Sequence, residues 1–411
     1  MNKLVLFTLN FPFGKGEAFL EPELPILSKV FDKVFILPNQ KVKGIRKLPQ
    51  NVTVVDIFSD RDKRINTLNI SKYFNSLLKI FIYSFIHSKR RYYYLKYWKS
   101  LVGFAIEDLS KKELLKDFII ENKLFNAIYY DYWFVNSTIS ISRLKKSNYL
   151  KFAVARCHRF DLYDEELYEK VVPFREYKLR HLNYLNPISN HGKKYLLSEI
   201  SKKYHSKIKL HYLGIDIVKI EDKVKTNSNV IVSCSRVVKH KKVLQIVDIL
   251  KQINIDIKWI HFGEGPLMSN LIEKCQDLPS NIKFELKGET DNQKILEFYS
   301  QVQVDLFVSL SESEGLPVSI MEAMMFGIPI YAKEVSGIPE IVDRYSGILI
   351  PKNSNDLYIR NNLLRGLKTN FDSTYISNRI KERFNSNINH TKYSQFLIDE
   401  FKKLDDKVQR R

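Results

Sequence analysis

Residues 304–333 read VDLFVSLSESEGLPVSIMEAMMFGIPIYAK, and this stretch contains a complete strand–loop–helix–strand pattern. The apolar run 304–310 predicts a strand, and residues 311–316 predict a loop. Pro317 suits the first position of a helix that continues over 318–326, and Gly327 and Pro329 end it. A second apolar run, 328–333, predicts the next strand. Strands that alternate with helices favour a parallel sheet covered by helices on both faces.

The same alternation extends along the rest of the chain. Short apolar segments recur at 3–9, 33–38, 52–58, 126–134 and 151–157, and again at 229–235, 257–263, 304–310, 328–333 and 347–351. Two such series predict an α/β protein with two doubly wound domains, and 411 residues are enough for two cores. We expect an N-terminal domain over 1–185, a second domain over 186–365, and C-terminal helices over 366–411 that pack back on the first domain.

Composition narrows the class of protein. The chain is 44% hydrophobic and 27% charged, which is typical of soluble globular proteins. Sixty-six Lys and Arg against 46 Asp and Glu give a formal charge of +20, so the surface should attract anionic groups. Three separate cysteines without a C-x-x-C pair favour a reduced, cytoplasmic setting and no structural zinc. Because the sequence has no zinc knuckle or RNA-binding signature, we expect no nucleic-acid partner, with polyanion binding as an alternative.

The segment 72–100 combines an apolar pattern with a basic and aromatic cluster. Apolar residues recur at helical spacing and are followed by SKRRYYYLKYWKS; they are Phe74, Leu77, Leu78, Phe81, Ile82 and Phe85. Two interpretations are open: a helix that contacts an anionic membrane surface, or a core-facing helix with a solvated basic edge. The sequence has no apolar run of about 20 residues that could span a bilayer. We therefore expect a cytoplasmic protein, with peripheral attachment to the inner face of the plasma membrane left open.

Charged and glycine residues follow the strands of the predicted second domain, where parallel sheets bind ligands. Arg236 and Lys241 follow segment 229–235, and a guanidinium with an ammonium group suits a diphosphate. Gly263 opens the turn GEGP, where a missing Cβ either lets the backbone approach a ligand or only allows a tight turn.

Two glutamates lie around the start of the helix predicted at 318–326. Glu314 lies in the loop, and Glu322 lies in a mostly apolar stretch of the helix, where an unpaired charge is costly. The free amides near 315–318 would point toward an anion. We therefore expect different functions for the two carboxylates, with Glu322 placed to accept hydrogen bonds from two ribose hydroxyls.

The residues EGLPVSIMEAMMFGIPIYAKEVSGIPEIV, 314–342, resemble the E-x7-E region of retaining glycosyltransferases of family 4, which have the GT-B fold. Other segments are similar to further parts of that family: CSRVVKHKK (234–242) to its diphosphate loop, HFGEGP (261–266) to its G-x-G-P turn, HYLGID (211–216) to its junction, FPFGKGEAFLEPELPIL (11–27) to its first loop, and CHRFDLY (157–163) to its H-G-x-D segment. The resemblance is dense over 229–351 and sparse over 40–150. It implies two Rossmann-like domains that face each other across a cleft.

The resemblance also implies roles for single residues. Arg236 and Lys241 would hold the donor diphosphate, Glu322 the ribose hydroxyls, and Glu314 the hydroxyls of the transferred sugar. His158 would face the reacting sugar, so Glu314 and His158 are the expected catalytic residues. The remaining donor-site residues are backbone positions that contact sugar and phosphate or let loops close over them: Gly315, Leu316, Pro317, Val318, Gly14, Gly16 and Gly263.

Three positions depart from the family pattern. Lys242 replaces the glycine that usually follows the diphosphate lysine, which leaves Lys241 and Lys242 as rival assignments. Arg159 replaces the glycine after His158, and Leu213-Gly214 replaces Asn-Gly at the junction. These departures concern the acceptor side more than the donor site.

The implied activity is retaining transfer of a hexose from a nucleotide-diphosphate sugar to an acceptor hydroxyl. The expected setting is bacterial surface polysaccharide, capsule, lipopolysaccharide or glycolipid biosynthesis, with a lipid-linked or saccharide acceptor. No metal or other cofactor is expected, because Arg236, Lys241 and a helix dipole would neutralise the leaving group. The alternatives are a catalytically inactive nucleotide-sugar-binding partner of another transferase and a polyanion-binding protein.

Overall fold

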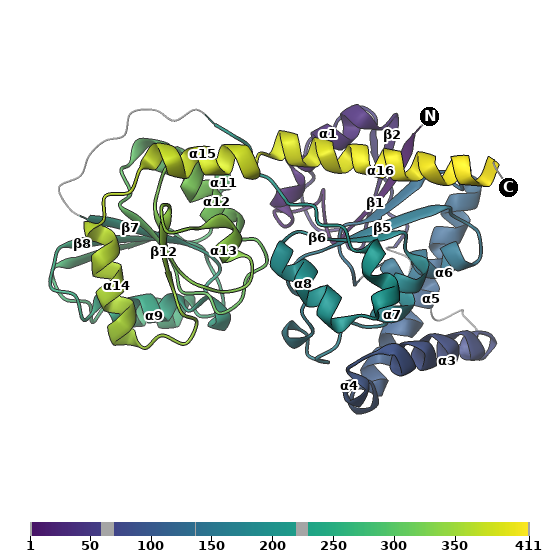
Figure 1. The fold of residues 1–411 in the computed structure, drawn as a ribbon, viewed down its shortest axis with the longest axis horizontal. Coiled ribbons are helices and arrows are strands. Elements are labelled where there is room, and N and C mark those ends of the chain that lie inside the picture. Colours follow the sequence, from purple (N-terminus) through teal and green to yellow (C-terminus); the bar gives the residue numbers. More distant parts are fainter. Residues whose placement is uncertain (1, 59–69, 136, 219–228, 410–411) are drawn as a thin grey trace. The chain divides into compact units, whose positions relative to one another are not determined.

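The computed structural model describes residues 2–58, 70–135, 137–218 and 229–409, and its contacts divide the chain into two units (Figure 1). The first unit is Met1–Gly214 with Ser386–Arg411, and the second is Ile215–Asn385. The boundary therefore lies about 30 residues later than the sequence predicted. The reason is that a sixth strand joins the first sheet and the helix after it belongs to the first unit. The polar stretch 219–228, which marked the expected join, lies outside the described residues.

The first unit is built on a parallel sheet in the order β3-β2-β1-β4-β5-β6. Its strands are β1 (Lys3–Thr8), β2 (Lys33–Pro38), β3 (Val52–Val54), β4 (Ile128–Asp131), β5 (Phe152–Cys157) and β6 (Tyr184–Pro187). Its helices are α1 (Glu23–Val30), α3 (Ile70–His87), α4 (Arg91–Lys96), α5 (Trp98–Glu121), α6 (Thr138–Lys146), α7 (Arg175–His181), α8 (Asn190–Glu199) and α16 (Ser386–Gln409).

Alternate side chains of β1 point to opposite faces of this sheet, and both faces are covered. Leu4 and Leu6 pack in a core with residues of α1 and α16, whereas Val5 and Phe7 pack in a core with residues of α5 and α6. Helices α3 and α4 form a further layer outside α5 and α7, on the side away from α16 (Figure 1). This burial on both faces explains why the strands are almost wholly apolar.

The second unit repeats the architecture, with its parallel sheet in the order β12-β11-β10-β7-β8-β9. Its strands are β7 (Asn229–Cys234), β8 (Ile257–Phe262), β9 (Ile282–Leu286), β10 (Leu306–Ser309), β11 (Ile330–Lys333) and β12 (Gly347–Ile350). Its helices are α9 (Val243–Leu250), α10 (Met268–Cys275), α11 (Asn292–Gln301), α12 (Val318–Met325), α13 (Ile338–Ile341), α14 (Asp356–Lys368) and α15 (Ser373–Arg383).

Both sheets have the strand order 3-2-1-4-5-6 when each unit is numbered from its own first strand. The strand order reverses between β1 and β4 in the first unit and between β7 and β10 in the second. The crevice beyond the carboxyl ends of the strands at such a reversal is where open α/β sheets bind ligands. Each unit therefore has one place where a site is expected.

Three details differ from the sequence prediction. The edge strands β6 and β9 were not predicted, because YLNP contains Asn and Pro and IKFEL alternates with charged residues instead of forming an apolar run. Pro317 is the N-cap of α12 and not its first residue, since its ψ of 109° is extended. The helices α14 and α15 belong to the second unit, and only α16 returns to the first.

Among the described residues, we find no helix of the length and apolarity needed to cross a membrane.

Candidate functional site

The loops after β7 and β10 meet at the strand-order reversal of the second unit. Lys241 Nζ lies 2.5 Å from Glu314 Oε1, and the amide of Glu312 donates to the carbonyl of His240 at 2.9 Å. The Glu314 residue is only 7% exposed. A buried carboxylate and a partly buried ammonium group thus form an ion pair at the place where the fold predicts a ligand.

Lys242 occupies a different environment. Its Nζ lies 3.0 Å from Glu312 Oε1 in a more exposed pair, with side-chain exposures of 32% and 42%. The backbone of Lys242 has φ of +53°, in the left-handed region that favours glycine, and the residue is also the N-cap of α9. This conformation would suit a glycine at position 242, and Lys241 is the lysine next to Glu314.

Glu322 lies one turn inside α12 and is partly buried. Asn292, the first residue of α11, donates a hydrogen bond from Nδ2 to Glu322 Oε1 at 2.7 Å. Burial raises the pKa of Glu322 to about 7, although the Asn292 hydrogen bond opposes the rise. Burial, and after it the Glu322 charge, raises the pKa of Cys234, at the end of β7, to about 12. The carboxylate therefore lies near the end of β7 in a poorly solvated environment.

The other residues assigned to the donor site surround these loops. Arg236 is exposed in the loop after β7. At Gly263, φ is +136° and a Cβ atom would lie 1.9 Å from the carbonyl oxygen of Ser235, and at Gly265 it would lie 2.5 Å from that of Val237. These glycines let the turn after β8 pack against the loop that carries Arg236.

The segment Gly315–Val318 leads from Glu314 into α12. Leu316 is 4% exposed and Pro317 caps the helix. The Glu314 amide lies 3.4 Å from Ser336 Oγ, in the loop after β11. Loops that follow three adjacent strands therefore hold this segment in place.

In the first unit, the loop after β1 folds around a carboxylate that the sequence analysis did not single out. Glu17 accepts hydrogen bonds from the amides of Leu9, Asn10 and Phe11, at 3.0, 2.7 and 2.7 Å, and from Trp133 Nε1 at 2.6 Å. Trp133 follows β4, so Glu17 joins the two loops at the strand-order reversal of this unit. The only signal in the sequence was an acidic residue directly after G-K-G.

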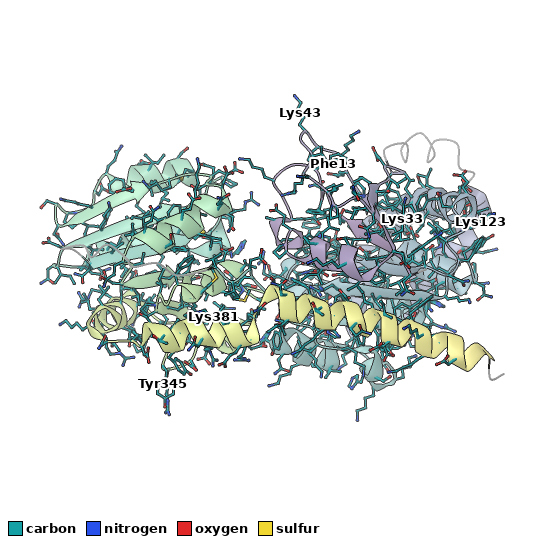
Figure 2. All side chains as sticks on the ribbon, turned by 90° about the horizontal axis from the view of Figure 1, so that it is seen from above. Phe13, Lys33, Lys43, Lys123, Tyr345 and Lys381 are labelled. Atoms are coloured by element: carbon teal, nitrogen blue, oxygen red, sulfur yellow. The ribbon has the colours of Figure 1, made fainter. Side chains whose placement is uncertain are left out.

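The two predicted glycines of this loop differ in their constraints. Gly14 has φ of +63°, and a Cβ atom there would lie 2.7 Å from Val42 Cγ2, so glycine is favoured. A Cβ atom on Gly16 would meet no atom within 4 Å. A groove beside this loop is lined by Phe13, Lys41, Val42, Lys43, Gly44, Ile45, Val54 and Asp56. Figure 2 shows Lys43 extending well beyond the ribbon above Phe13.

His158 follows β5 and packs in an aromatic cluster. Its ring centroid lies 4.7 Å from that of Tyr132 and 4.4 Å from that of Trp133. Asp161 accepts from the amide of His158 at 2.6 Å and from the amide of Phe134 at 3.0 Å, and Asp161 Oδ2 lies 3.5 Å from His158 Nδ1. Neither ring nitrogen has a hydrogen-bond partner among the described residues. The backbone of this buried imidazole is thus fixed by Asp161, and both of its ring nitrogens are buried without a hydrogen bond from the described residues.

The positions that depart from the family pattern have local partners. Arg159 Nη1 lies 2.6 Å from Glu166 Oε2, and the carbonyl of Leu213 accepts from Asn389 Nδ2 at 2.8 Å. The side chain of Arg159 is thus directed to a nearby acid. Leu213 connects the junction to the start of α16.

The described residues contain no group of three or more His, Cys, Asp or Glu side chains that could hold a metal ion. Arg236, Lys241, Glu314, Glu322 and Gly263 belong to the second unit, and Gly14, Gly16 and His158 to the first.

Residues 216–370 match the family model described as glycosyl transferases group 1. This segment is therefore similar to a glycosyltransferase group 1 domain. It coincides with most of the second unit and contains the Lys241–Glu314 pair, Arg236 and Glu322.

A curated relative and two solved structures illustrate the similarity. The amylovoran biosynthesis glycosyltransferase AmsK of Erwinia amylovora is 32% identical over 109 residues, which cover 25% of this chain and 27% of AmsK. The lipopolysaccharide outer core galactosyltransferase WaaB, in its apo form, aligns with a TM-score of 0.67 and 14% identity, covering 96% of this chain and 99% of WaaB. Anabaena HepE, in complex with UDP and glucose, aligns with a TM-score of 0.64 and 14% identity, covering 96% of this chain and 99% of HepE.

These structural matches extend over both units, so the chain has the two-domain α/β architecture of GT-B proteins. The chain spans about a third or less of the length of the first curated relatives it matches.

Proposed function

We propose that the protein is a retaining glycosyltransferase that moves a hexose from a nucleotide-diphosphate sugar to an acceptor hydroxyl. The observation that carries the proposal is the Lys241–Glu314 ion pair at the strand-order reversal of a glycosyltransferase group 1 domain. A ligand that brings both a diphosphate and sugar hydroxyls would give each partner of this pair a new contact.

Each charged group has a task in that reaction. The diphosphate gains negative charge as it leaves, and Arg236, Lys241 and the amides at the start of α12 would stabilise it. Glu322 would accept hydrogen bonds from the ribose, and Glu314 from the transferred sugar. His158, with its unpaired ring nitrogens, would contact the reacting sugar from the first unit. We further propose that no metal is needed, since these cations would neutralise the leaving group.

We place the activity in bacterial surface polysaccharide or glycolipid biosynthesis, with a saccharide or lipid-linked acceptor. Several curated relatives are named for bacterial polysaccharide or O-antigen biosynthesis, which supports this setting. HepE structures contain UDP or UDP-glucose, which makes uridine nucleotides the first donors to test.

The test is thermal stabilisation of the purified protein by UDP, GDP and ADP, with Glu322→Ala and Arg236→Ala as variants. A ligand at about 100 times its dissociation constant stabilises the folded state by about 2.7 kcal/mol. We expect one nucleotide to raise the melting temperature of the wild type and to have little effect on the variants. Sugar transfer would then be measured with donors that carry that base and with EDTA present, and loss of activity in EDTA would contradict the metal-independent mechanism.

The same experiment separates the alternatives. Nucleotide binding without turnover of any donor would favour an inactive partner of another transferase. No stabilisation by any nucleotide, together with retention on heparin, would favour polyanion binding, as the charge of +20 allows.

A further inference from the structure

Helix α3 is apolar on two sides, and the core of the first unit uses only one of them. Ile80 and Ser84 are buried, and Leu77 and Phe81 are partly buried against a core cluster formed with α4, α5 and α7. This inner face satisfies the interpretation of α3 as an ordinary core-facing helix. It does not account for the remaining apolar residues.

The outer side of α3 carries a second set of apolar residues at four-residue spacing: Phe74, Leu78, Ile82 and Ile86, which are 61%, 42%, 44% and 50% exposed. Residues four apart lie one above another on a helix, so the four form a continuous stripe. The chain continues past α3 with three more exposed side chains: Tyr92, Leu95 and Trp98, at 66%, 60% and 50% exposure. Exposed apolar side chains grouped along a helix in this way mark interaction sites.

The segment that carries this stripe has side-chain charges of one sign. No Asp or Glu occurs between Asp62 and Glu107. Exposed cations lie along the stripe and beyond it: Lys79, Lys89, Arg91, Lys96 and Lys99. Two of them lie beside aromatic rings, with Lys96 Nζ 5.3 Å from the ring centre of Tyr97 and Lys99 Nζ 5.8 Å from that of Trp98. An exposed apolar stripe, exposed aromatic rings and a run of cations without an acidic residue in the same segment fit an anionic surface with an apolar interior.

Arg90 does not belong to this surface, although the sequence places it in the basic cluster. Its guanidinium lies 3.0 Å from Asp164, 2.5 Å from Glu165 and 3.2 Å from Glu199. It therefore connects α4 to the rest of the unit. Replacing Arg90 would disturb the fold, so it is unsuitable as a probe of the surface.

We propose that the outer face of α3, with Tyr92, Leu95 and Trp98, binds the surface of an anionic lipid bilayer. The helix would lie in the plane of the interface with Leu78, Ile82 and Ile86 among the acyl chains. Lys79, Arg91, Lys96 and Lys99 would contact lipid phosphates. This inference does not rest on the proposed transferase activity, and it is compatible with a lipid-linked acceptor.

The test is flotation of the purified protein with vesicles of phosphatidylcholine, either alone or with about a third phosphatidylglycerol, compositions that separate charge from apolar insertion. We expect the wild type to float with the anionic vesicles and not with the neutral ones. A charge variant, Lys79→Glu, Lys96→Glu and Lys99→Glu, should reduce binding about tenfold or more, because each cation near such a surface contributes substantially.

An apolar variant, Leu78→Gln, Ile82→Gln and Ile86→Gln, should also lose vesicle binding while keeping its melting temperature, since these side chains are exposed. The matched control for charge is Lys29→Glu, Lys392→Glu and Lys402→Glu, three exposed lysines on α1 and α16. The matched control for apolar area is Ile272→Gln, Phe284→Gln and Leu357→Gln in the second unit, which are 48%, 40% and 55% exposed. Both controls should float like the wild type.

Three results would overturn the proposal. The first is a wild type that does not float with anionic vesicles. The second is an apolar variant that floats as well as the wild type, which would mean that charge alone holds the protein to polyanions. The third is a wild-type dimer in solution that dissociates in the apolar variant without any vesicle binding, which would make the stripe an interface between two copies of the chain.

Discussion

The partly buried carboxylate of Glu322 lowers the free energy of unfolding of the ligand-free protein at neutral pH. Burial raises its pKa to about 7, whereas the unfolded chain would ionise it near the ordinary value of 4.5. Below both values the carboxyl is protonated in both states and the penalty is absent. As the pH rises from about 4.5 to 7, the unfolded chain loses its proton first, so folded stability falls. A carboxylate that weakens the fold at neutral pH is best explained by a ligand that supplies its hydrogen bonds.

We therefore expect Glu322→Gln to stabilise the ligand-free protein at pH 8 by about 1–2 kcal/mol and to leave it unchanged at pH 4. The same variant should lose nucleotide-sugar affinity. Wild-type affinity should rise between pH 6 and 8, since ribose hydroxyls donate to the ionised form, and the variant should show no such rise. Denaturant unfolding and calorimetric titration measure the two effects. A variant that is less stable at pH 8 would contradict this account.

Substitutions of the adjacent Lys241 and Lys242 should have different effects on nucleotide affinity and on stability. Lys241→Ala removes the partner of the buried Glu314, so we expect a loss of nucleotide affinity of at least about tenfold and reduced stability. Lys242→Gly removes an exposed pair of small energetic value and relieves a left-handed backbone, so stability should rise by about 0.5–1 kcal/mol with little change in affinity. Fluorescence titration with the stabilising nucleotide would measure the affinity of both variants, and denaturant unfolding would measure their stability. If Lys242→Gly has the larger effect on affinity, the assignment is reversed.

The loop after β1 depends on Glu17 for its shape. Its carboxylate accepts hydrogen bonds from three successive amides and from Trp133. Removal of this carboxylate would leave those four donors without their acceptor. We expect Glu17→Ala to lower the free energy of unfolding by about 2–4 kcal/mol and to accelerate hydrogen exchange of the amides of residues 9–11. Lys43→Ala, an exposed lysine beside the same loop, is the control. Unchanged exchange at these amides would show that the loop is held by other contacts.

The strands and helices were predictable to the extent that burial makes them apolar on both faces. Central strands such as β1 and β7 read as continuous hydrophobic runs, but β6 and β9 do not, because YLNP contains Asn and Pro and IKFEL has charged residues within the strand. The glutamates of the E-x7-E pattern and Arg236 stood out in the sequence. Glu17 and Asn292 did not, since a single polar side chain has no periodic signal and its partners come from distant segments.

The two units differ in how the chain forms them. The second unit, Ile215–Asn385, is continuous and contains its own core around Trp259 and Leu306. We expect residues 215–385 to fold alone, with a cooperative thermal transition and binding of the nucleotide that stabilises the whole chain, at reduced affinity. Circular dichroism and calorimetry would test this. A fragment without a cooperative transition would show that the unit depends on the rest of the chain.

The first unit is discontinuous and should depend on α16. One side of α16 is buried in the core that it shares with α1, through Tyr393, Leu397, Ile398 and Phe401. A chain ending at residue 385 loses these side chains, each of which contributes about 1.5–3 kcal/mol by burial, so its first unit should unfold at a much lower temperature. The second unit of the same truncated chain, if nucleotide still stabilises it, serves as an internal control.

The order of strands and helices, the two cores and the charged loops after β7 and β10 follow from the sequence, because apolar periodicity and glycine or proline positions act over a few residues. The tertiary structure alone decided where the units divide, that only α16 of the expected C-terminal helices returns to the first unit, and that Lys241 and not Lys242 faces Glu314. It also decided that the apolar residues of α3 divide between a buried and an exposed face. These features depend on contacts between segments far apart in the chain, which local sequence patterns do not specify.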